Sequence, residues 1–253
     1  GLAVGDINGD GLDDLYVCQE GGLPNLLFVQ NRDGTARDVS EAAGINFLES
    51  SRSALLLDFD NDGDQDLAVA VFANVVLSEN DGAGRFTLRT VLPTTNDTFS
   101  LCSADYDDDG DLDLYVCGYM QTQLTDRLSV LPVSSADSLY HDANDGAPNN
   151  LFRNDSTSKN RWQFTDVTEE VGLDVNNRRY SFAATWEDFD NDGDQDIYVA
   201  NDLGRNNLYR NDGGRFVDIA DIGKAEDIAF GMGVTCADFD RDGWMDVYVS
   251  NMF

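Results

Sequence analysis

Five acidic segments of nine residues carry the chemistry that this sequence encodes most clearly. They span residues 6–14, 58–66, 105–113, 188–196 and 238–246, and each fits the pattern D-x-[DN]-x-D-G-x-x-D. Ca²⁺ is bound in proteins by six to eight oxygens from carboxylates, carbonyls and water. Carboxylates packed this densely on one turn repel each other unless a cation lies between them. The pattern therefore predicts calcium as the cofactor, at about five sites that are part of the architecture.

The spacing also predicts which residues hold the metal. The first, third, fifth and ninth positions offer side-chain oxygens, the seventh offers its backbone carbonyl, and the invariant glycine at the sixth lets the chain curl around the ion. The predicted ligands are Asp6, Asn8, Asp10, Leu12 and Asp14; Asp58, Asp60, Asp62, Asp64 and Asp66; Asp105, Asp107, Asp109, Asp111 and Asp113; Asp188, Asp190, Asp192, Asp194 and Asp196; and Asp238, Asp240, Asp242, Trp244 and Asp246.

The nearest alternative to this loop is the EF-hand, which shares its first six positions. An EF-hand needs a glutamate at position 12 and a helix on each side. Position 12 is valine in all five copies, inside short stretches such as LYV and IYV that are typical of β-strands. We therefore expect each loop to be a turn between two strands.

The strongly acidic composition limits the kinds of partner that the chain can bind. The chain of 253 residues has 48 acidic and 16 basic residues and a formal charge of −32. Nucleic acid and anionic membrane surfaces are poor partners for such a charge, and no apolar run reaches the ~18 residues of a membrane span. The hydrophobic fraction of 42% is too high for a disordered acidic chain.

The repeats predict the fold. Strand-like segments and turns recur about every 50 residues, giving repeat units of about 1–53, 54–100, 101–183, 184–233 and, incompletely, 234–253. Radial repetition of four-stranded units is typical of a β-propeller. We therefore predict an all-β chain, residues 1–253 forming one propeller domain of about five blades, with a calcium loop in each blade.

A few residues outside the loops are also candidates for function. An insertion of about 118–147 contains the only histidine, His141, and is either a partner contact or a decoration. Cys102 and Cys117 flank the third loop and would either form a disulfide or be buried as free thiols, like Cys18 and Cys236. Trp162 and Trp244 would either stack on sugar rings or pack at the rim.

The loops resemble those of the FG-GAP/VCBS repeat family, to which the propellers of integrin α-subunits belong. Phe230-Gly231 before the fifth loop matches the FG letters of that family. The longer pattern DFDNDGDQDIYVAND…NNLYRNDGGRFVDI is similar to cartilage acidic proteins and their bacterial ASPIC/UnbV-type relatives. The resemblance covers nearly the whole chain. It implies a ring of seven blades, of which this chain would be a part.

These features favour a non-enzymatic, extracellular, calcium-binding scaffold for adhesion, matrix or filament assembly, secreted or at the cell surface. Weak calcium sites are filled at extracellular calcium concentrations. The partner would be a protein or a glycan, or another copy that pairs along an exposed strand edge. One alternative is a carbohydrate- or protein-binding module of a larger secreted enzyme. Another is a propeller lyase or hydrolase acting on glycans, since paired carboxylates are abundant.

Overall fold

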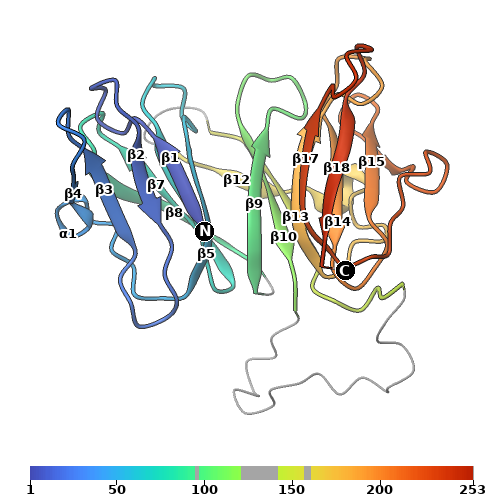
Figure 1. Cartoon of the computed structure of the whole chain (residues 1–253), viewed down its shortest axis with the longest axis horizontal. Helices are drawn as coiled ribbons and strands as arrows, with labels where there is room; N and C mark the ends of the chain where they lie inside the picture. Colours follow the sequence, from blue (N-terminus) through green and yellow to red (C-terminus); the bar gives the residue numbers. More distant parts are fainter. Residues whose placement is uncertain (95–96, 121–141, 157–160, 253) are drawn as a thin grey trace. The chain divides into compact units, whose positions relative to one another are not determined.

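The structure is a computed structural model that describes residues 1–94, 97–120, 142–156 and 161–252. The chain divides into two compact units: unit 1 contains residues 1–94 and 154–165, and unit 2 contains residues 95–153 and 166–253. Antiparallel sheets make up both units, as Figure 1 shows. His141 and most of the predicted insertion lie outside the described residues.

Unit 1 contains two four-stranded sheets, each with its strands in sequence order. Their first strands, β1 and β5, pack against each other. The first sheet consists of β1 (Leu2–Gly5), β2 (Asp14–Val17), β3 (Leu26–Gln30) and β4 (Ala36–Asp38), followed by the short helix α1 (Ser40–Ala43). The second consists of β5 (Ser51–Leu57), β6 (Asp66–Val71), β7 (Asn74–Asn80) and β8 (Phe86–Pro93).

The remaining three sheets follow the same strand order. The third consists of β9 (Thr98–Ala104), β10 (Asp113–Gly118), β11 (Asn150–Asn154) and β12 (Phe164–Asp166), followed by α2 (Thr168–Val171). The fourth consists of β13 (Ser181–Glu187), β14 (Asp196–Asn201), β15 (Asn207–Asn211) and β16 (Phe216–Asp218). The fifth has two described strands, β17 (Gly231–Ala237) and β18 (Asp246–Asn251). In unit 2, β13 packs against both β9 and β17.

The second strand of each complete sheet shows why these residues form this fold. Strands β6, β10 and β14 are buried along their whole length, because each has a strand on both sides and other residues on both faces. Continuous apolar stretches such as LAVAV suit that position, since β-branched residues pack well on a pleated surface. Each unit has its own hydrophobic core around such strands.

The two helices are single turns that sequence periodicity does not reveal. Each ends at a glycine with positive φ, 78° at Gly44 and 91° at Gly172, a conformation that stops a helix at low steric cost. Apart from them, the described chain is all-β, which confirms the predicted fold class and its four-stranded repeats. The propeller arrangement, its closure into a seven-bladed ring, the calcium in the loops and a single domain stay predictions. The described part of the chain contains no helix with the length and hydropathy needed to span a membrane.

The cysteines are free thiols. Cys102 lies opposite Tyr115 in the pairing of β9 with β10, and Cys117 lies opposite Ser100, so the two cysteines are not cross-strand partners. Of the two alternatives, the structure shows free thiols, with Cys117 buried and Cys102 partly buried, and burial raises the pKa of both groups.

Candidate metal centres

Each of the five loops joins the first strand of its sheet to the second, as predicted. The glycine at the sixth position has positive φ in every loop, from 82° at Gly11 to 102° at Gly193. Position 12 lies in the following strand in all five copies. These observations confirm the prediction that each loop is a turn between two strands. They exclude an EF-hand, in which a helix flanks the loop on each side.

The first carboxylate of each loop is held by the loop's own backbone. In the fourth loop, Asp188 accepts hydrogen bonds from the N–H groups of Asp192 at 3.1 Å and Gly193 at 3.0 Å. The same pair of bonds recurs at Asp6, Asp58, Asp105 and Asp238, with distances between 2.8 and 3.1 Å. A carboxylate with both oxygens anchored in this way keeps its orientation, which is the preorganisation a metal site needs.

The fifth carboxylate is anchored similarly, by the N–H of the seventh residue. Asp10, Asp62, Asp109, Asp192 and Asp242 each accept this bond at 2.9 to 3.0 Å. The fourth position adopts positive φ as well, at Gly9, Asn61, Asp108, Asn191 and Arg241. Sequence reasoning missed this second left-handed residue, although the glycine and asparagines there are a usable signal.

The ninth carboxylate connects the loop to the third strand of its sheet. In the second loop, Asp66 accepts hydrogen bonds from the N–H of Phe59 at 3.0 Å and from the N–H of Asn80 at 2.9 Å. Asp14 and Asp196 accept the equivalent pairs of bonds. The sequence predicted these residues as ligands but not this cross-strand role.

Carboxylate oxygens from three positions converge in four of the five loops, with all the ligand atoms of a group within 4.8 Å of one another. The groups are Asp58, Asp60 and Asp62; Asp105, Asp107 and Asp113; Asp188, Asp190 and Asp196; and Asp238, Asp240 and Asp246. The first loop has asparagine at its third position, and the Asn8 amide donates to Asp14 at 3.3 Å. The carboxylates of the seventh position do not join these groups, and Asp194 instead accepts from the N–H of Gly213.

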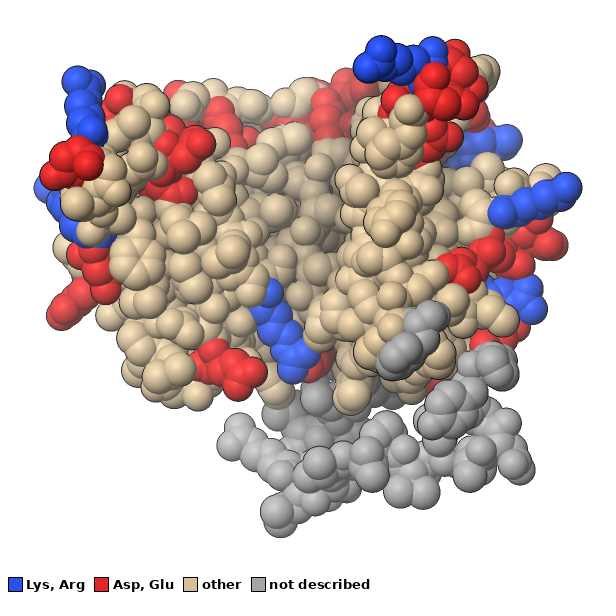
Figure 2. All heavy atoms as spheres, viewed as in Figure 1, with Lys and Arg blue, Asp and Glu red and all other residues tan. Residues whose placement is uncertain are grey.

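The donor chemistry fits a hard divalent cation. Among the described residues, the buried Oδ1 of Asp107 accepts no hydrogen bond, and the charge of Arg153 only partly offsets the burial and the neighbouring carboxylates that raise the pKa of this group. Figure 2 shows Asp and Glu side chains gathered at the upper right, where Figure 1 places the loop between β17 and β18. Two unit charges 4 Å apart repel by about 4 kcal/mol at an effective dielectric constant of 20.

Burial makes the ionised form of the ninth carboxylate costly without a cation. It raises the pKa of Asp66 to about 7 and that of Asp196 to about 6, although both accept N–H hydrogen bonds that lower these values. Neighbouring carboxylates raise both pKa values further. Burial also raises the pKa of Asp107. A metal ion would reverse this balance by favouring the charged form.

Asparagine residues at the ends of the third strands link successive repeats at these loops. Sequence analysis predicted strands and turns here but not this link. The Asn80 side chain donates to the carbonyl of Ile7 at 2.8 Å, Asn154 to that of Phe59 at 2.9 Å, and Asn211 to that of Tyr106 at 2.8 Å. Each carbonyl belongs to the second position of the loop one repeat earlier. The recurring Asn at the end of each third strand was the available signal.

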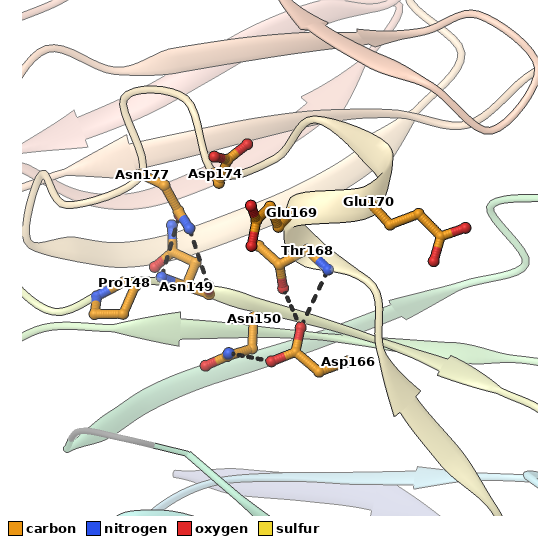
Figure 3. A pocket seen from close by; sticks show the side chains of 9 residues that line it. All are labelled: Pro148, Asn149, Asn150, Asp166, Thr168, Glu169, Glu170, Asp174 and Asn177. Atoms are coloured by element: carbon orange, nitrogen blue, oxygen red, sulfur yellow. Dashed lines mark hydrogen bonds between the residues drawn. The ribbon is translucent and has the colours of Figure 1, made fainter.

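A surface cavity of about 720 Å³ in unit 2 is a second candidate site. Figure 3 shows Asp166 accepting hydrogen bonds from Thr168 and Asn150, with Glu169 and Asp174 nearby and Glu170 extending away. The cavity is lined by Pro148, Asn149, Asn150, Asp166, Thr168, Glu169, Glu170, Asp174 and Asn177. A similar cavity of about 630 Å³ in unit 1 includes Pro24, Asp38, Ser40 and Glu41.

The two tryptophans singled out in the sequence differ in their surroundings. Trp162 is partly buried and lies against Phe59 and Phe164, with ring centroids 6.4 and 6.5 Å apart. Trp244, in the fifth loop, is 52% exposed. Of the two, Trp244 therefore has the more accessible ring.

Comparisons with known proteins place this geometry in a family. The model of the FG-GAP-like repeat matches residues 6–69, 58–116 and 188–249, so its matches begin and end at the loops and their following strands. None of the curated proteins compared with the chain matches it.

Three solved structures are similar at low sequence identity. A lectin from Agrocybe aegerita, described as recognising non-reducing terminal N-acetylglucosamine, is 17% identical over 98% of this chain and 56% of its own, with a TM-score of 0.46. The V. cholerae biofilm matrix protein Bap1 is 14% identical over 98% and 34%, with a TM-score of 0.47. A Bacillus licheniformis rhamnogalacturonan lyase is 15% identical over 92% and 43%, with a TM-score of 0.42. The chain spans little more than half of the lectin and less than half of the other two.

Proposed function

The chain belongs to the FG-GAP-like repeat family, and on that premise we propose that it is a non-enzymatic scaffold whose repeats are stiffened by calcium. The observation that carries this proposal is that the first carboxylate of all five loops is held by the same backbone hydrogen bonds, with carboxylate groups converging beside it in four of them. A catalytic site is built once, whereas a feature repeated in every sheet serves the architecture.

The side chains of the first, third, fifth and ninth positions would hold the ion in each loop, together with the carbonyl of the seventh. Bound Ca²⁺ would supply positive charge that offsets the repulsion among these carboxylates. Because the ninth carboxylate also bonds to the third strand, a filled loop would fix the first three strands of a sheet together. A rigid, strongly acidic repeat of this kind suits an extracellular role in adhesion, matrix or filament assembly, where calcium is abundant.

Counting the bound ions tests this proposal. Native mass spectrometry of the chain in calcium is expected to show about five Ca²⁺, one for each loop. Asp107→Asn removes the buried charge that lacks a hydrogen-bonded partner at its Oδ1 and is expected to lower the count by one. Asp174→Asn makes the same chemical change outside the loops and should leave the count unchanged. Equal counts in Asp107→Asn and the unaltered chain, or no bound calcium, would contradict the proposal.

The cavity of Figure 3 favours a second candidate, a module that binds a polar ligand. Its lining offers carboxylate acceptors and amide donors, which suit a hydroxyl-rich or amine-bearing ligand such as a glycan. A glycan-binding screen tests this candidate, with Asn150→Ala and Glu169→Gln as variants in the cavity. Binding that both variants weaken would support the module, and binding that neither affects would place the ligand elsewhere.

A further inference from the structure

Two of the five loops are identical in sequence. Residues 58–66 and 188–196 both read DFDNDGDQD. Their ninth carboxylates, Asp66 and Asp196, are both buried, and each accepts the same pair of N–H hydrogen bonds. Because the nine residues are the same, a difference in calcium affinity between these loops has to come from residues outside them.

A difference in charge lies on the third strand, opposite the ninth carboxylate. The register of β6 with β7 places Glu79 opposite Asp66, one step after the last backbone pair. The register of β14 with β15 places Arg210 opposite Asp196 in the same way. Facing residues of an antiparallel pair have Cβ atoms about 4.5–5.5 Å apart. One loop therefore has a further anionic residue beside it, and its identical counterpart has a cationic one.

Each of these two charged side chains also has an ion-pair partner. Glu79 pairs with Arg89, which lies on β8, one strand farther from the loop. Arg210 pairs with Asp212 at 2.9 Å, and this turn acid has a counterpart in the second repeat, Asp81. The turn acid is therefore common to both repeats, and the charge on the third strand is what distinguishes them.

The charge of Arg210 acts on the carboxylates of its loop. Its Nε is buried and has no hydrogen-bond partner among the described residues. The pKa of Arg210 is raised by its bond to Asp212 and further by the charges of Asp190 and Asp196, two predicted metal ligands. An arginine that attracts these carboxylates also repels a divalent cation placed among them.

The third repeat resembles the fourth at this position, and the first is uncharged. Arg153 lies opposite Asp113 by the register of β10 with β11. Burial raises the pKa of Asp107 in the same loop, and the charge of Arg153 acts in the opposite direction. In the first repeat, Val29 lies opposite Asp14. The first four repeats therefore present valine, glutamate, arginine and arginine to their loops.

We propose that this residue of the third strand sets the calcium affinity of its loop, so that the second loop stays filled at calcium concentrations at which the third and fourth have emptied. The inference rests on the proposed calcium scaffold and adds a graded response to it. Glutamate attracts a divalent ion at this distance, whereas arginine supplies part of the neutralising charge itself and repels the ion. Falling calcium would therefore loosen the third and fourth sheets before the second.

A calcium titration of the chain, followed by NMR of the Gly63 and Gly193 amides, tests this inference. These glycines occupy the same position of the two identical loops, and each N–H donates to the first carboxylate of its loop. Gly63 is expected to reach half of its response at about tenfold lower free calcium than Gly193, because the charge beside the ion differs in sign.

Three variants separate charge from packing. Arg210→Gln removes the positive charge and is expected to lower the Gly193 midpoint about tenfold, with a smaller change at Gly63. Arg210→Lys keeps the charge and should leave the Gly193 midpoint nearly unchanged. Glu79→Gln is expected to raise the Gly63 midpoint.

Three results would overturn the inference. Equal midpoints at Gly63 and Gly193 in the unaltered chain would do so while leaving the calcium scaffold intact. Equal shifts in Arg210→Gln and Arg210→Lys would assign the effect to packing and not to charge. No response of either glycine to millimolar calcium would contradict the proposed function, and the inference with it.

Discussion

A single carboxylate in each loop combines a structural and a chemical role. Asp66 is fully buried, bonds to the start of its loop and to the end of its third strand, and lies near the acids of the predicted metal site. The first role needs a hydrogen-bond acceptor, which a protonated carboxyl still provides through one oxygen. The second needs a charge. The balance between these two states therefore depends on pH and on metal.

Without metal, the chain is expected to be more stable at pH 5 than at pH 8. The folded-state pKa of Asp66, about 7, lies above its ordinary value of 3.8, so folding favours the protonated form. This contribution is fully present below the ordinary pKa and is lost as pH rises through about 7. The contribution of Asp196 has the same sign, and it is lost as pH rises through the folded-state pKa of that group, about 6. Each pKa unit corresponds to about 1.4 kcal/mol, so the expected difference is a few kcal/mol, of the order of 2–4.

Denaturant unfolding in chelator at the two pH values measures this difference. Asp66→Asn is the matched control, because an asparagine at this position does not titrate and the pH dependence should shrink. Calcium should also reduce it by favouring the ionised form. Greater stability of the chelated chain at pH 8 would contradict the argument.

At the scale of elements, the loops and the third strands depend on one another. Asn211 is fully buried and ends β15. Its N–H reaches Asp196, its amide reaches two carbonyls, and its own side-chain oxygen accepts from Gly214 at 2.7 Å. Two loops from successive repeats and one outer turn therefore meet at this side chain.

Replacing Asn211 with alanine is expected to destabilise unit 2 by about 2–4 kcal/mol. The substitution leaves buried carbonyl groups without donors, and each such group costs about 1–3 kcal/mol. Asn31→Ala is the matched control, since Asn31 follows β3 and, among the described residues, its side chain bonds only to nearby Thr35. Urea unfolding of both variants would measure the costs. Similar small losses in the two would show that the link between repeats contributes little.

The elements also show where sequence reasoning succeeds and where it stops. The five loops and the strands after them follow from residue types that recur at fixed spacing. The strand at position 12 of each loop and the left-handed backbone at Gly193 were therefore predictable. The bonds of Asp66 to Asn80 depend on strand register, which the spacing alone does not fix. Helices α1 and α2 escaped prediction because one turn gives no periodicity. The cavity beside Asp166 escaped because it joins residues from separate parts of the repeat.

For the whole molecule, charge and repetition support the same account. A formal charge of −32 disfavours a compact chain unless cations offset it, and about half of the acidic residues lie in the five loops. Each repeat contains the same loop, three repeats contain a second strand that is buried along its whole length, and three contain the same asparagine link. Calcium would therefore act on the stability of every sheet together, and its removal would affect the entire chain.

Thermal unfolding in millimolar Ca²⁺, in millimolar Mg²⁺ and in excess chelator tests the central claim most directly. A ligand at 100 times its Kd stabilises the folded state by about 2.7 kcal/mol per site, so several filled loops should raise Tm strongly. The account predicts a large rise in calcium, and a much smaller one in magnesium because Mg²⁺ demands octahedral geometry and gives up its water reluctantly. Equal Tm values in calcium and chelator would contradict it.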